Sequence, residues 1–344
     1  MATLGNLNLS NADLAKRKDN SGRVQQVIEI LNEVKPIVDD MVMVECNSGM
    51  SHKTTVRTGI PTPTWRKLYS GVQSTKSTTQ QIVDSCGNLE ARPKIDIDVV
   101  DNSGDPAGTR LSEQVPHIEG MGQTVASTIF YGDTSVNPER FMGLSPRFSE
   151  YTRSTPDQTK IDYNVLTAGG SGSDNTSIWY ITWGNNTCSG IYPNGASGGL
   201  SHKDMGQLEV EADDSSGSFD AYVDKYKWQL GLSVRDWRAC GRIANIDVSA
   251  LEAESSAADL IKYMIKLQER LRGTNMGKGF WYMHPRVATQ LRIQMLGAGE
   301  TSAKWNTNLT FDNVEGKEVM SFGGVPIHRE DSLLLTEAAI TQAS

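Results

Sequence analysis

Apolar side chains recur at steps of three and four residues, the spacing of one helix face, in the N-terminal part of the chain and again beyond Pro116. The first of these segments begins at Ser21, which is suited to cap it, and Pro36 limits or kinks it. The second begins at Pro116, because the first turn of a helix tolerates proline, and is expected to end at Gly132 in the left-handed conformation. The two patterns predict an N-terminal helix and a central helix.

Two more helices are predicted towards the C-terminal end. The run Ser249-Ala-Leu-Glu252 matches a capping box and leads to a helix over residues 256–272, which Gly273 is expected to stop. An aromatic strand over residues 279–283 then precedes a helix over residues 285–296.

Strict alternation of apolar and polar side chains, the period of a strand with one buried face, is clearest at residues 222–235 and 94–99. Shorter β-prone runs occur at residues 54–58, 81–83, 179–183, 208–211 and 318–329. Because strands and helices are interleaved along the chain, the pattern predicts an α+β fold.

Composition adds that part of the chain is poor in core residues. The apolar share is 38%, or roughly 44% when Gly is counted and Tyr is not, just under the usual range of about 45–50%. The deficit lies in residues 49–101, an extended stretch with a Ser/Thr/Gln tract, and in the Gly/Ser/Asn/Asp-rich residues 150–220. Such a stretch cannot offset its ordering entropy alone, so something outside the chain is expected to hold residues 49–101.

Length and charge narrow the function classes. A chain of 344 residues favours two packed lobes. The net charge of −8 argues against a free-standing nucleic-acid binder, although an acidic protein can lie beside packed DNA without adhering to it. The polar residues 1–20 are expected to form an arm, not a secretory signal, and no apolar run is long enough to predict a membrane span.

No residue pattern indicates a catalytic, cofactor-binding or metal-binding site. The four cysteines are far apart and form no CxxC pair, so reduced thiols are expected; they are Cys46, Cys86, Cys188 and Cys240. The five histidines show no chelating spacing, and the paired carboxylates are explained by solvated strand faces and turns. A hydrolase or sugar-binding protein remains a distant alternative because Trp179, Trp183 and Tyr192 lie in a polar region.

Three segments, in this order, resemble stretches of the major capsid proteins of tailed bacteriophages. Residues 130–147 contain Phe-Tyr-Gly-Asp and then Pro-Glu-Arg-Phe-Met-Gly-Leu-Ser-Pro-Arg, and are similar to the stretch that follows the long spine helix of that family. Residues 279–285, Gly-Phe-Trp-Tyr-Met-His-Pro, resemble its aromatic strand-to-helix unit. Residues 322–331, Phe-Gly-Gly-Val-Pro-Ile-His-Arg-Glu-Asp, resemble its late strand.

The resemblance implies the Hong-Kong-97-type capsid fold, with an N-terminal arm, an extended β-hairpin loop, a peripheral domain with the spine helix, and an axial domain. In that family the hairpin lies across a neighbouring subunit. The expected segments are the N-terminal arm and helix (1–48), the extended loop and peripheral strand (49–101), the peripheral domain with the spine helix (102–150), the first part of the axial domain with loops (151–218), the long peripheral strands (219–248), the axial helices and strand (249–315), and the closing strand with the C-terminal tail (316–344).

The function implied is structural: the chain forms hexamers and pentamers that close an icosahedral shell around double-stranded DNA in the virion, after assembly in the cytoplasm of a bacterial host. Charged residues expected at contacts between subunits are Arg66, Lys67, Glu139 and Arg140. Some members of that family carry their own N-terminal scaffolding segment, but the roughly fifty residues before the extended region are too few for one. A separate scaffolding protein is therefore expected, together with a portal and a decoration or cement protein. No lysine or asparagine matches the covalent cross-link of some family members, so none is predicted.

One alternative shares the fold. An encapsulin-like compartment would enclose cargo enzymes in place of DNA, and it would need a groove for a cargo peptide on the inner face. DNA inside purified particles would favour the phage capsid over the compartment.

Overall fold

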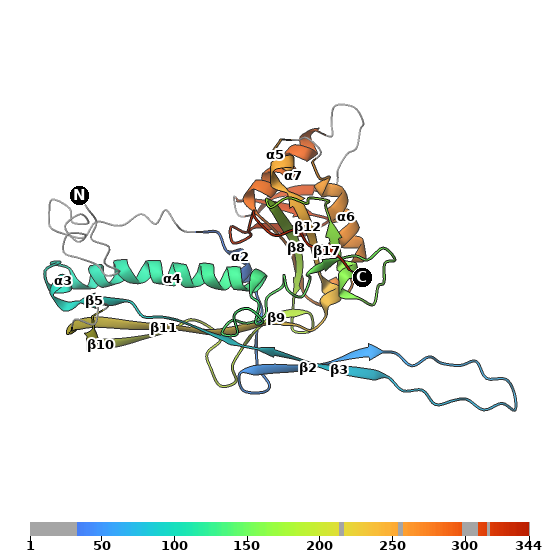
Figure 1. The fold of residues 1–344 in the computed structure, drawn as a ribbon, viewed down its shortest axis with the longest axis horizontal. Helices are drawn as coiled ribbons and strands as arrows, with labels where there is room; N and C mark the ends of the chain where they lie inside the picture. Colours follow the sequence, from blue (N-terminus) through green and yellow to red (C-terminus); the bar gives the residue numbers. More distant parts are fainter. Residues whose placement is uncertain (1–32, 213–216, 254–256, 298–308, 315–316, 344) are drawn as a thin grey trace.

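The computed structural model describes residues 33–212, 217–253, 257–297, 309–314 and 317–343. An arm and a hairpin point in opposite directions along its long axis, and a lobe of helices and strands stands on the middle (Figure 1). Helices and strands are interleaved along the chain, which confirms the α+β class.

The predicted N-terminal arm, and most of the helix that was expected to begin at Ser21, lie outside the described residues. Where the description begins, residues 33–35 have no regular structure. Pro36 then opens the short helix α2 (Pro36–Asp40), as the missing N–H of proline allows.

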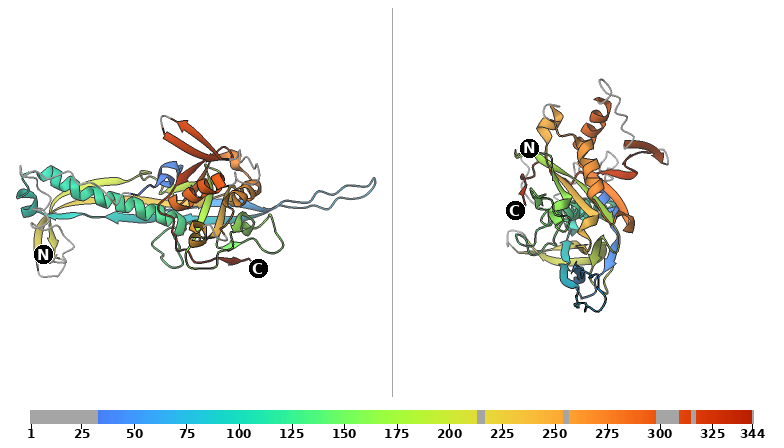
Figure 2. Two further views of the ribbon diagram at one scale, coloured as in Figure 1. Left: turned by 90° about the horizontal axis from the view of Figure 1, so that it is seen from above. Right: turned by 90° about the vertical axis from the view of Figure 1, so that its right-hand side faces the viewer.

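The arm seen in Figure 1 is a different element from the predicted N-terminal arm. It consists of helix α4 (Pro106–Tyr131) lying along strand β11 (Ser218–Val234), as Figure 2 shows from above. The long strand predicted at residues 222–235 is therefore confirmed.

The predicted start of the central helix is wrong by ten residues. Asp105 caps α4 by accepting a hydrogen bond from the Gly108 amide at 3.1 Å, and Pro106 takes the first helical position. Pro116 therefore lies inside the helix, where it has no N–H to donate to the carbonyl one turn earlier. Gly132 follows the helix with φ of −57°, so the expected left-handed end is also wrong.

Residues 94–99 do not form one strand, contrary to their alternating pattern. Strand β5 (Lys94–Asp96) gives way to helix α3 (Ile97–Asp101), because the Asp96 side chain accepts a hydrogen bond from the Asp98 amide at 2.9 Å and caps that helix. Turning into a helix lets two consecutive valines, Val99 and Val100, both be buried in a small cluster at the far end of the arm.

The described strands of the body form a branched 13-stranded sheet with the main path β10-β11-β9-β8-β13-β16-β15-β14. Besides β11, the path contains β8 (Asn175–Trp183), β9 (Cys188–Tyr192), β10 (Ser201–Glu211), β13 (Lys278–Met283), β14 (Leu309–Val314), β15 (Lys317–Phe322) and β16 (Val325–Arg329). Branches and a separate small pair comprise β1 (Met43–Glu45), β4 (Gly87–Ala91), β5, β7 (Val165–Thr167), β12 (Cys240–Asp247), and β6 (Glu150–Tyr151) with β17 (Thr341–Gln342). The short strands predicted in this region are confirmed.

The helices of the lobe are α5 (Val248–Glu252), α6 (Leu260–Arg270) and α7 (Pro285–Gly297). The helix predicted at residues 285–296 is confirmed, but the capping box is wrong. Asp247 caps α5 by accepting from the Ala250 amide at 2.8 Å, so Ser249 lies inside that helix. The next helix begins separately, at its own cap Asp259, and ends before Gly273, whose φ of 78° is left-handed.

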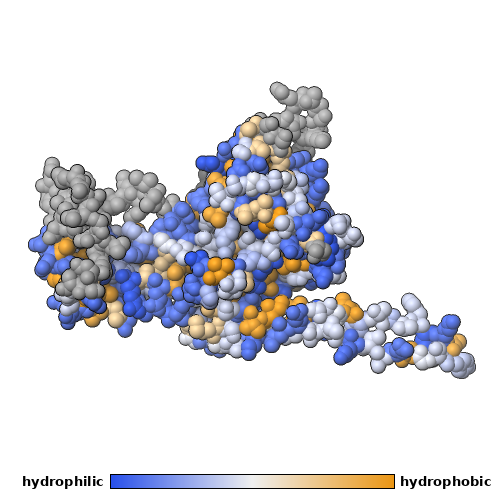
Figure 3. Space-filling view, viewed as in Figure 1, coloured by the Kyte–Doolittle hydropathy of each residue, from blue (hydrophilic) through white to orange (hydrophobic). Residues whose placement is uncertain are grey.

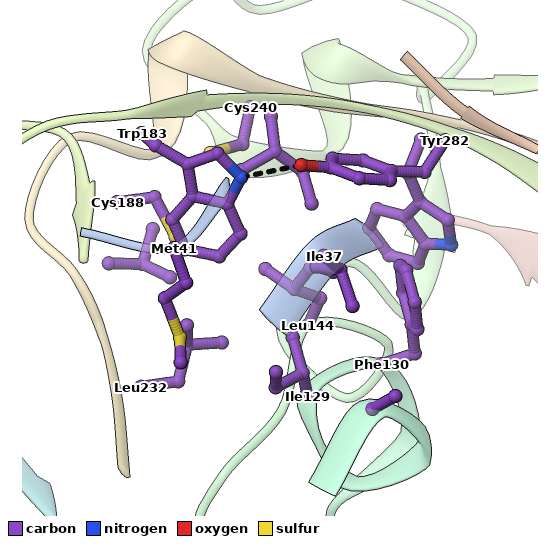
Figure 4. Close-up of a cluster of buried hydrophobic side chains, with 14 of the residues drawn as sticks. Ile37, Met41, Ile129, Phe130, Leu144, Trp183, Cys188, Leu232, Cys240 and Tyr282 are labelled. Atoms are coloured by element: carbon purple, nitrogen blue, oxygen red, sulfur yellow. Dashed lines mark hydrogen bonds between the residues drawn. The ribbon is translucent and has the colours of Figure 1, made fainter. Parts of the chain in front are cut away.

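Strand β8 divides the interior into two cores. All nine of its residues are buried, because alternate side chains point to opposite faces and both faces are covered. Trp179 and Trp183 join the core under α4 and α2, whereas Tyr180 joins the core under α6 and α7. Figure 4 shows the first core, where the Trp183 indole N–H donates to the Tyr282 hydroxyl at 2.8 Å.

The two tryptophans that suggested a sugar-binding surface are therefore core residues. Trp179 is 0% exposed and Trp183 is 1% exposed, so neither ring can stack on a ligand from solution.

The segment after α4 folds back tightly on the end of that helix. The Leu144 amide donates to the Ile129 carbonyl at 2.9 Å, and the Gly143 amide donates to the Gly132 carbonyl at 2.7 Å. A Cβ on Gly143 would lie 2.6 Å from the Thr128 carbonyl oxygen, closer than atoms approach. This backbone contact explains why a glycine stands in the segment 130–147.

Gly143→Ala is expected to destabilise the chain by roughly 2–3 kcal/mol, because the new methyl group must push the turn away from the helix. Chemical denaturation of the purified chain measures this loss. The control is Gly120→Ala on the exposed face of α4, where a Cβ meets no atom within 4 Å. That change should stabilise the chain by up to about 1 kcal/mol. Equal effects of the two substitutions would contradict the role of the close contact.

Candidate assembly site

The hairpin of strands β2 (Ser51–Gly59) and β3 (Thr78–Ser85) leaves the body and carries an open loop at its end (Figure 1). Its strands confirm the β-prone runs at residues 54–58 and 81–83. Their antiparallel register pairs Ser51 with Ser85. Only His52 and Asp84, at the root, are buried in these strands. A two-stranded hairpin without a core is at best marginally stable in water, so this one depends on its attachments.

The loop at the end of the hairpin, residues 60–77, is called the tip. Its large apolar side chains are bare: Trp65 is 100% exposed and Leu68 is 85% exposed. Tyr69 has φ of 65°, an uncommon conformation for a residue with a side chain. The space-filling view shows the hairpin projecting away from the rest of the molecule (Figure 3). Large exposed aromatic side chains of this kind are typical of contact surfaces.

The hairpin is also uniformly basic. Between residues 53 and 83 there is no acidic residue, while the basic residues are Lys53, Arg57, Arg66, Lys67 and Lys76. The tip therefore combines positive charge with apolar surface, in a chain whose net charge is −8.

The four residues predicted for contacts between subunits fall into two places. Arg66 and Lys67 lie exposed on the tip, next to Trp65. Glu139 and Arg140 lie exposed in the turn after α4, whose backbone packs on Gly87 at the start of β4. Across the described part of the chain, no ion pair joins one place to the other.

The root of the hairpin is held by charged side chains that the sequence did not single out. Asp84 accepts from the Arg147 guanidinium at 2.7 Å and from the Ser233 hydroxyl at 2.9 Å. On the opposite strand, the Arg235 guanidinium donates to His52 Nε2 at 2.5 Å. Burial, and then the positive charge of Arg235, lower the pKa of His52, so the neutral ring accepts this hydrogen bond.

The opposite end of the molecule, where α3, the start of α4 and the β10–β11 hairpin meet, is called the far end. It is fastened around Asp224, which accepts from Arg110 at 3.0 Å and Gln114 at 2.6 Å of α4, and contacts His202 Nε2 of β10 at 2.9 Å. Its exposed acidic residues are Asp98, Asp101, Asp105, Asp204, Glu209, Glu211 and Asp220, of which Asp204 is paired with Arg110 at 3.0 Å.

An apolar stripe runs along α4 beside these acidic residues. Leu111, Val115 and Ile118 lie at steps of four and three residues, so they share one helix face, and Leu111 is 61% exposed. The far end thus offers the acidic and apolar counterpart of the tip.

The stem of the N-terminal arm, residues 33–41, is tied to the end of β16 and to the segment after it. The Ile37 amide donates to Glu330 at 3.2 Å, the Val34 amide donates to Asp331 at 2.9 Å, and His328 contacts Asp40 at 2.6 Å. Burial raises the pKa of Glu330 to about 7, although the Ser332 hydroxyl hydrogen bond opposes this shift.

Within the described ranges, no three histidine, cysteine or carboxylate side chains converge as metal ligands would. Among the same residues, no helix is long and apolar enough to cross a membrane.

Comparison with known proteins gives matches that extend over most of the chain. The family model described as major capsid protein GP7 matches residues 19–341. A chain of the near-atomic cryo-EM structure of bacteriophage Epsilon15 is 32% identical, with a TM-score of 0.76 and coverage of 100% of both chains. The bacteriophage JBD30 capsid is 8% identical, with a TM-score of 0.44 over 88% of this chain and 92% of that one. No curated protein matches the chain.

Asp84→Asn is expected to loosen the hairpin root, because it removes the charge that neutralises the half-buried Arg147. A loss of about 2 kcal/mol corresponds to roughly thirtyfold faster amide exchange of the root amides in β2 and β3. Hydrogen exchange followed by mass spectrometry measures this. The same substitution at the exposed Asp101 should leave the hairpin unchanged, and an unchanged hairpin in Asp84→Asn would refute the role of the ion pair.

The raised pKa of Glu330 predicts that stability falls as pH rises. The unfolded carboxyl ionises from about pH 4.5, whereas the folded one keeps its proton until about 7. The contribution of this carboxyl to the free energy of unfolding is therefore fully present below pH 4.5 and is lost by about pH 7, a loss on the order of 3 kcal/mol. Glu330→Gln should remove most of this fall in denaturation experiments between pH 5 and 8, whereas Glu211→Gln at an exposed site should retain it. A fall of the same size in both variants would count against Glu330.

Proposed function

Since the chain belongs to the family of major capsid protein GP7, we propose that its hairpin is the element through which copies join into the shell of a tailed phage. The family match confirms the resemblance seen in the three sequence segments. It makes the chain a structural component of the virion with the Hong-Kong-97-type capsid fold, and not an enzyme. Copies of the chain assemble into a capsid lattice.

The observation that carries the proposal is the bare tip. A fully exposed tryptophan and its apolar neighbours would cost free energy in water, and the hairpin has no core of its own to support them. A second copy supplies the missing partner surface. The opposite chemistry of the far end, which is acidic and carries an apolar stripe on α4, makes it the complementary surface on that copy.

Such a contact is head to tail, because the tip and the far end lie at opposite ends of one molecule (Figure 1). Head-to-tail contacts repeat from copy to copy and close into rings. We infer that one chain forms both hexamers and pentamers in this way, with the glycine-rich loops at residues 169–174 and 193–199, outside the buried strands β8 and β9, adapting the angle between copies.

The charged residues predicted from the sequence take specific roles in this arrangement. Arg66 and Lys67 on the tip pair with far-end acids of the neighbouring copy, such as Asp101 and Asp105. Glu139 and Arg140 offer both signs of charge near the hairpin root and make a second contact between subunits.

The remaining partners are proposed on the basis of family resemblance and charge. A separate scaffolding protein, a portal and a decoration or cement protein complete the shell, which assembles in the cytoplasm of the bacterial host. The net charge of −8 lets the shell enclose double-stranded DNA without gripping it. The seven segments expected from the sequence, from the arm (1–48) to the closing strand and tail (316–344), remain the proposed division of the chain. An encapsulin-like compartment is less well supported, because the family model and the 32% identical relative both belong to phage.

Trp65→Ser is expected to raise the concentration at which particles form by roughly thirtyfold, the effect of losing about 2 kcal/mol from a central aromatic contact. Because Trp65 is 100% exposed, the unfolding free energy of the chain should not change. Light scattering and negative-stain microscopy measure particle formation, and denaturation measures folding.

The charge-reversed variant Arg66→Glu with Lys67→Glu should also impair assembly, and added salt should reduce the difference from the natural chain, because salt screens exposed charges. Thr79→Ser, on the exposed face of β3, is the control and should assemble normally. Normal assembly of the Trp65 and charge-reversed variants would overturn the proposed role of the tip.

A further inference from the structure

Two of the four cysteines meet where the hairpin leaves the body. Cys46 precedes β2 and Cys86 follows β3, so the two residues flank the whole hairpin. Their sulfur atoms lie 3.5 Å apart, in direct contact. Residues separated by forty positions in sequence are thus brought together at one point, although their spacing predicted only reduced thiols.

The backbone holds both residues firmly in this position. The Cys46 amide donates to the Tyr192 carbonyl at 2.9 Å, and the Cys86 amide donates to the Met50 carbonyl at 2.9 Å. On the other side of Cys86, a Cβ on Gly231 would lie only 3.1 Å from the Cys86 Cα, so the glycine lets this residue lie directly against β11. The contact between the sulfurs is therefore set by the sheet and not by chance side-chain positions.

We propose that Cys46 and Cys86 form a disulfide that closes the hairpin root once the particle meets an oxidising environment. To form the bond, the sulfurs must approach from 3.5 Å to the bonded distance of about 2.05 Å. Virion surfaces are among the places where disulfides persist, whereas the cytosol keeps thiols reduced.

A small-molecule disulfide such as oxidised glutathione serves as the oxidant. The Cys86 thiolate attacks one of its sulfurs, forming a mixed disulfide and releasing one glutathione thiolate, which takes up a proton. The Cys46 thiolate then attacks the Cys86 sulfur and releases the second glutathione. The two cysteines together lose two electrons and two protons, and one oxidised glutathione becomes two reduced molecules.

The exposure of the two thiols determines which one reacts first, and their raised pKa makes the reaction slow. Cys46 is 2% exposed, whereas Cys86 is partly exposed, so the oxidant reaches Cys86 first. Burial raises the pKa of both thiols, which keeps the thiolate fraction small and the pair reduced during brief exposure. Cys188 in β9 and Cys240 in β12 are both fully buried, out of reach of the same reagent.

The test is to count free thiols in purified particles before and after incubation with oxidised glutathione. The particles are denatured, labelled with N-ethylmaleimide and weighed by mass spectrometry. The reduced chain should take up four labels and the oxidised chain two. Cys46→Ser should take up three labels before oxidation and, because no second thiol can release the glutathione from Cys86, two labels with one glutathione attached after it. Peptide mapping should join Cys46 to Cys86 within one chain, as a single-chain band on a non-reducing gel will show.

Four labels on the oxidised chain, a bond that joins other cysteines, or a disulfide between chains would overturn the proposal. The hairpin amides of oxidised particles should exchange more slowly than those of reduced ones, and a reducing agent should reverse this. The same labelling on unassembled chain gives an answer even if the tip does not direct assembly, so the two proposals fail separately.

Discussion

A two-stranded hairpin that buries almost no side chain cannot hold its own shape, and the organisation of this chain follows from that constraint. The hairpin must be fixed at its root by the body and completed at its tip by something else. The root meets the first need through Asp84 with Arg147 and His52 with Arg235, which connect both strands to the body. The second need makes the chain incomplete as a monomer.

The body is rigid enough to serve as the anchor. Strand β8 is buried on both faces, so the core below α4 and the core below α6 and α7 share one wall of side chains. The turn after α4 packs on the helix end through the bare backbone of Gly143. The hairpin is therefore attached to a single closely packed unit and not to a flexible linker.

Local patterns in the sequence predicted the elements whose structure is determined locally. The alternation at residues 222–235 gave β11, and proline followed by apolar spacing gave α7. The predictions were wrong where more than one residue could begin a helix. Asp105 outcompetes Pro116 as the start of α4, Asp96 turns an alternating run into a helix, and Asp247 takes the cap expected of Ser249.

The candidate site was predictable only in part, for a related reason. Arg66 and Lys67 stand out because the surrounding tract is polar and lacks a core, and the structure places them on the bare tip. His52, Asp84 and the Cys46–Cys86 contact depend on residues more than thirty positions apart, which no single-sequence pattern brings together. Arg147 lies at the end of the segment 130–147 that carried the family resemblance, so that segment held the one available signal for the root.

An electron cryo-microscopy reconstruction of the assembled particle tests the central claim most directly, because it locates the tip relative to its neighbours. The account predicts that Trp65 and Leu68 lie buried against α4 of an adjacent copy, with Arg66 and Lys67 beside its far-end acids. A tip that projects into solvent, or folds back on its own subunit in every copy, would contradict it.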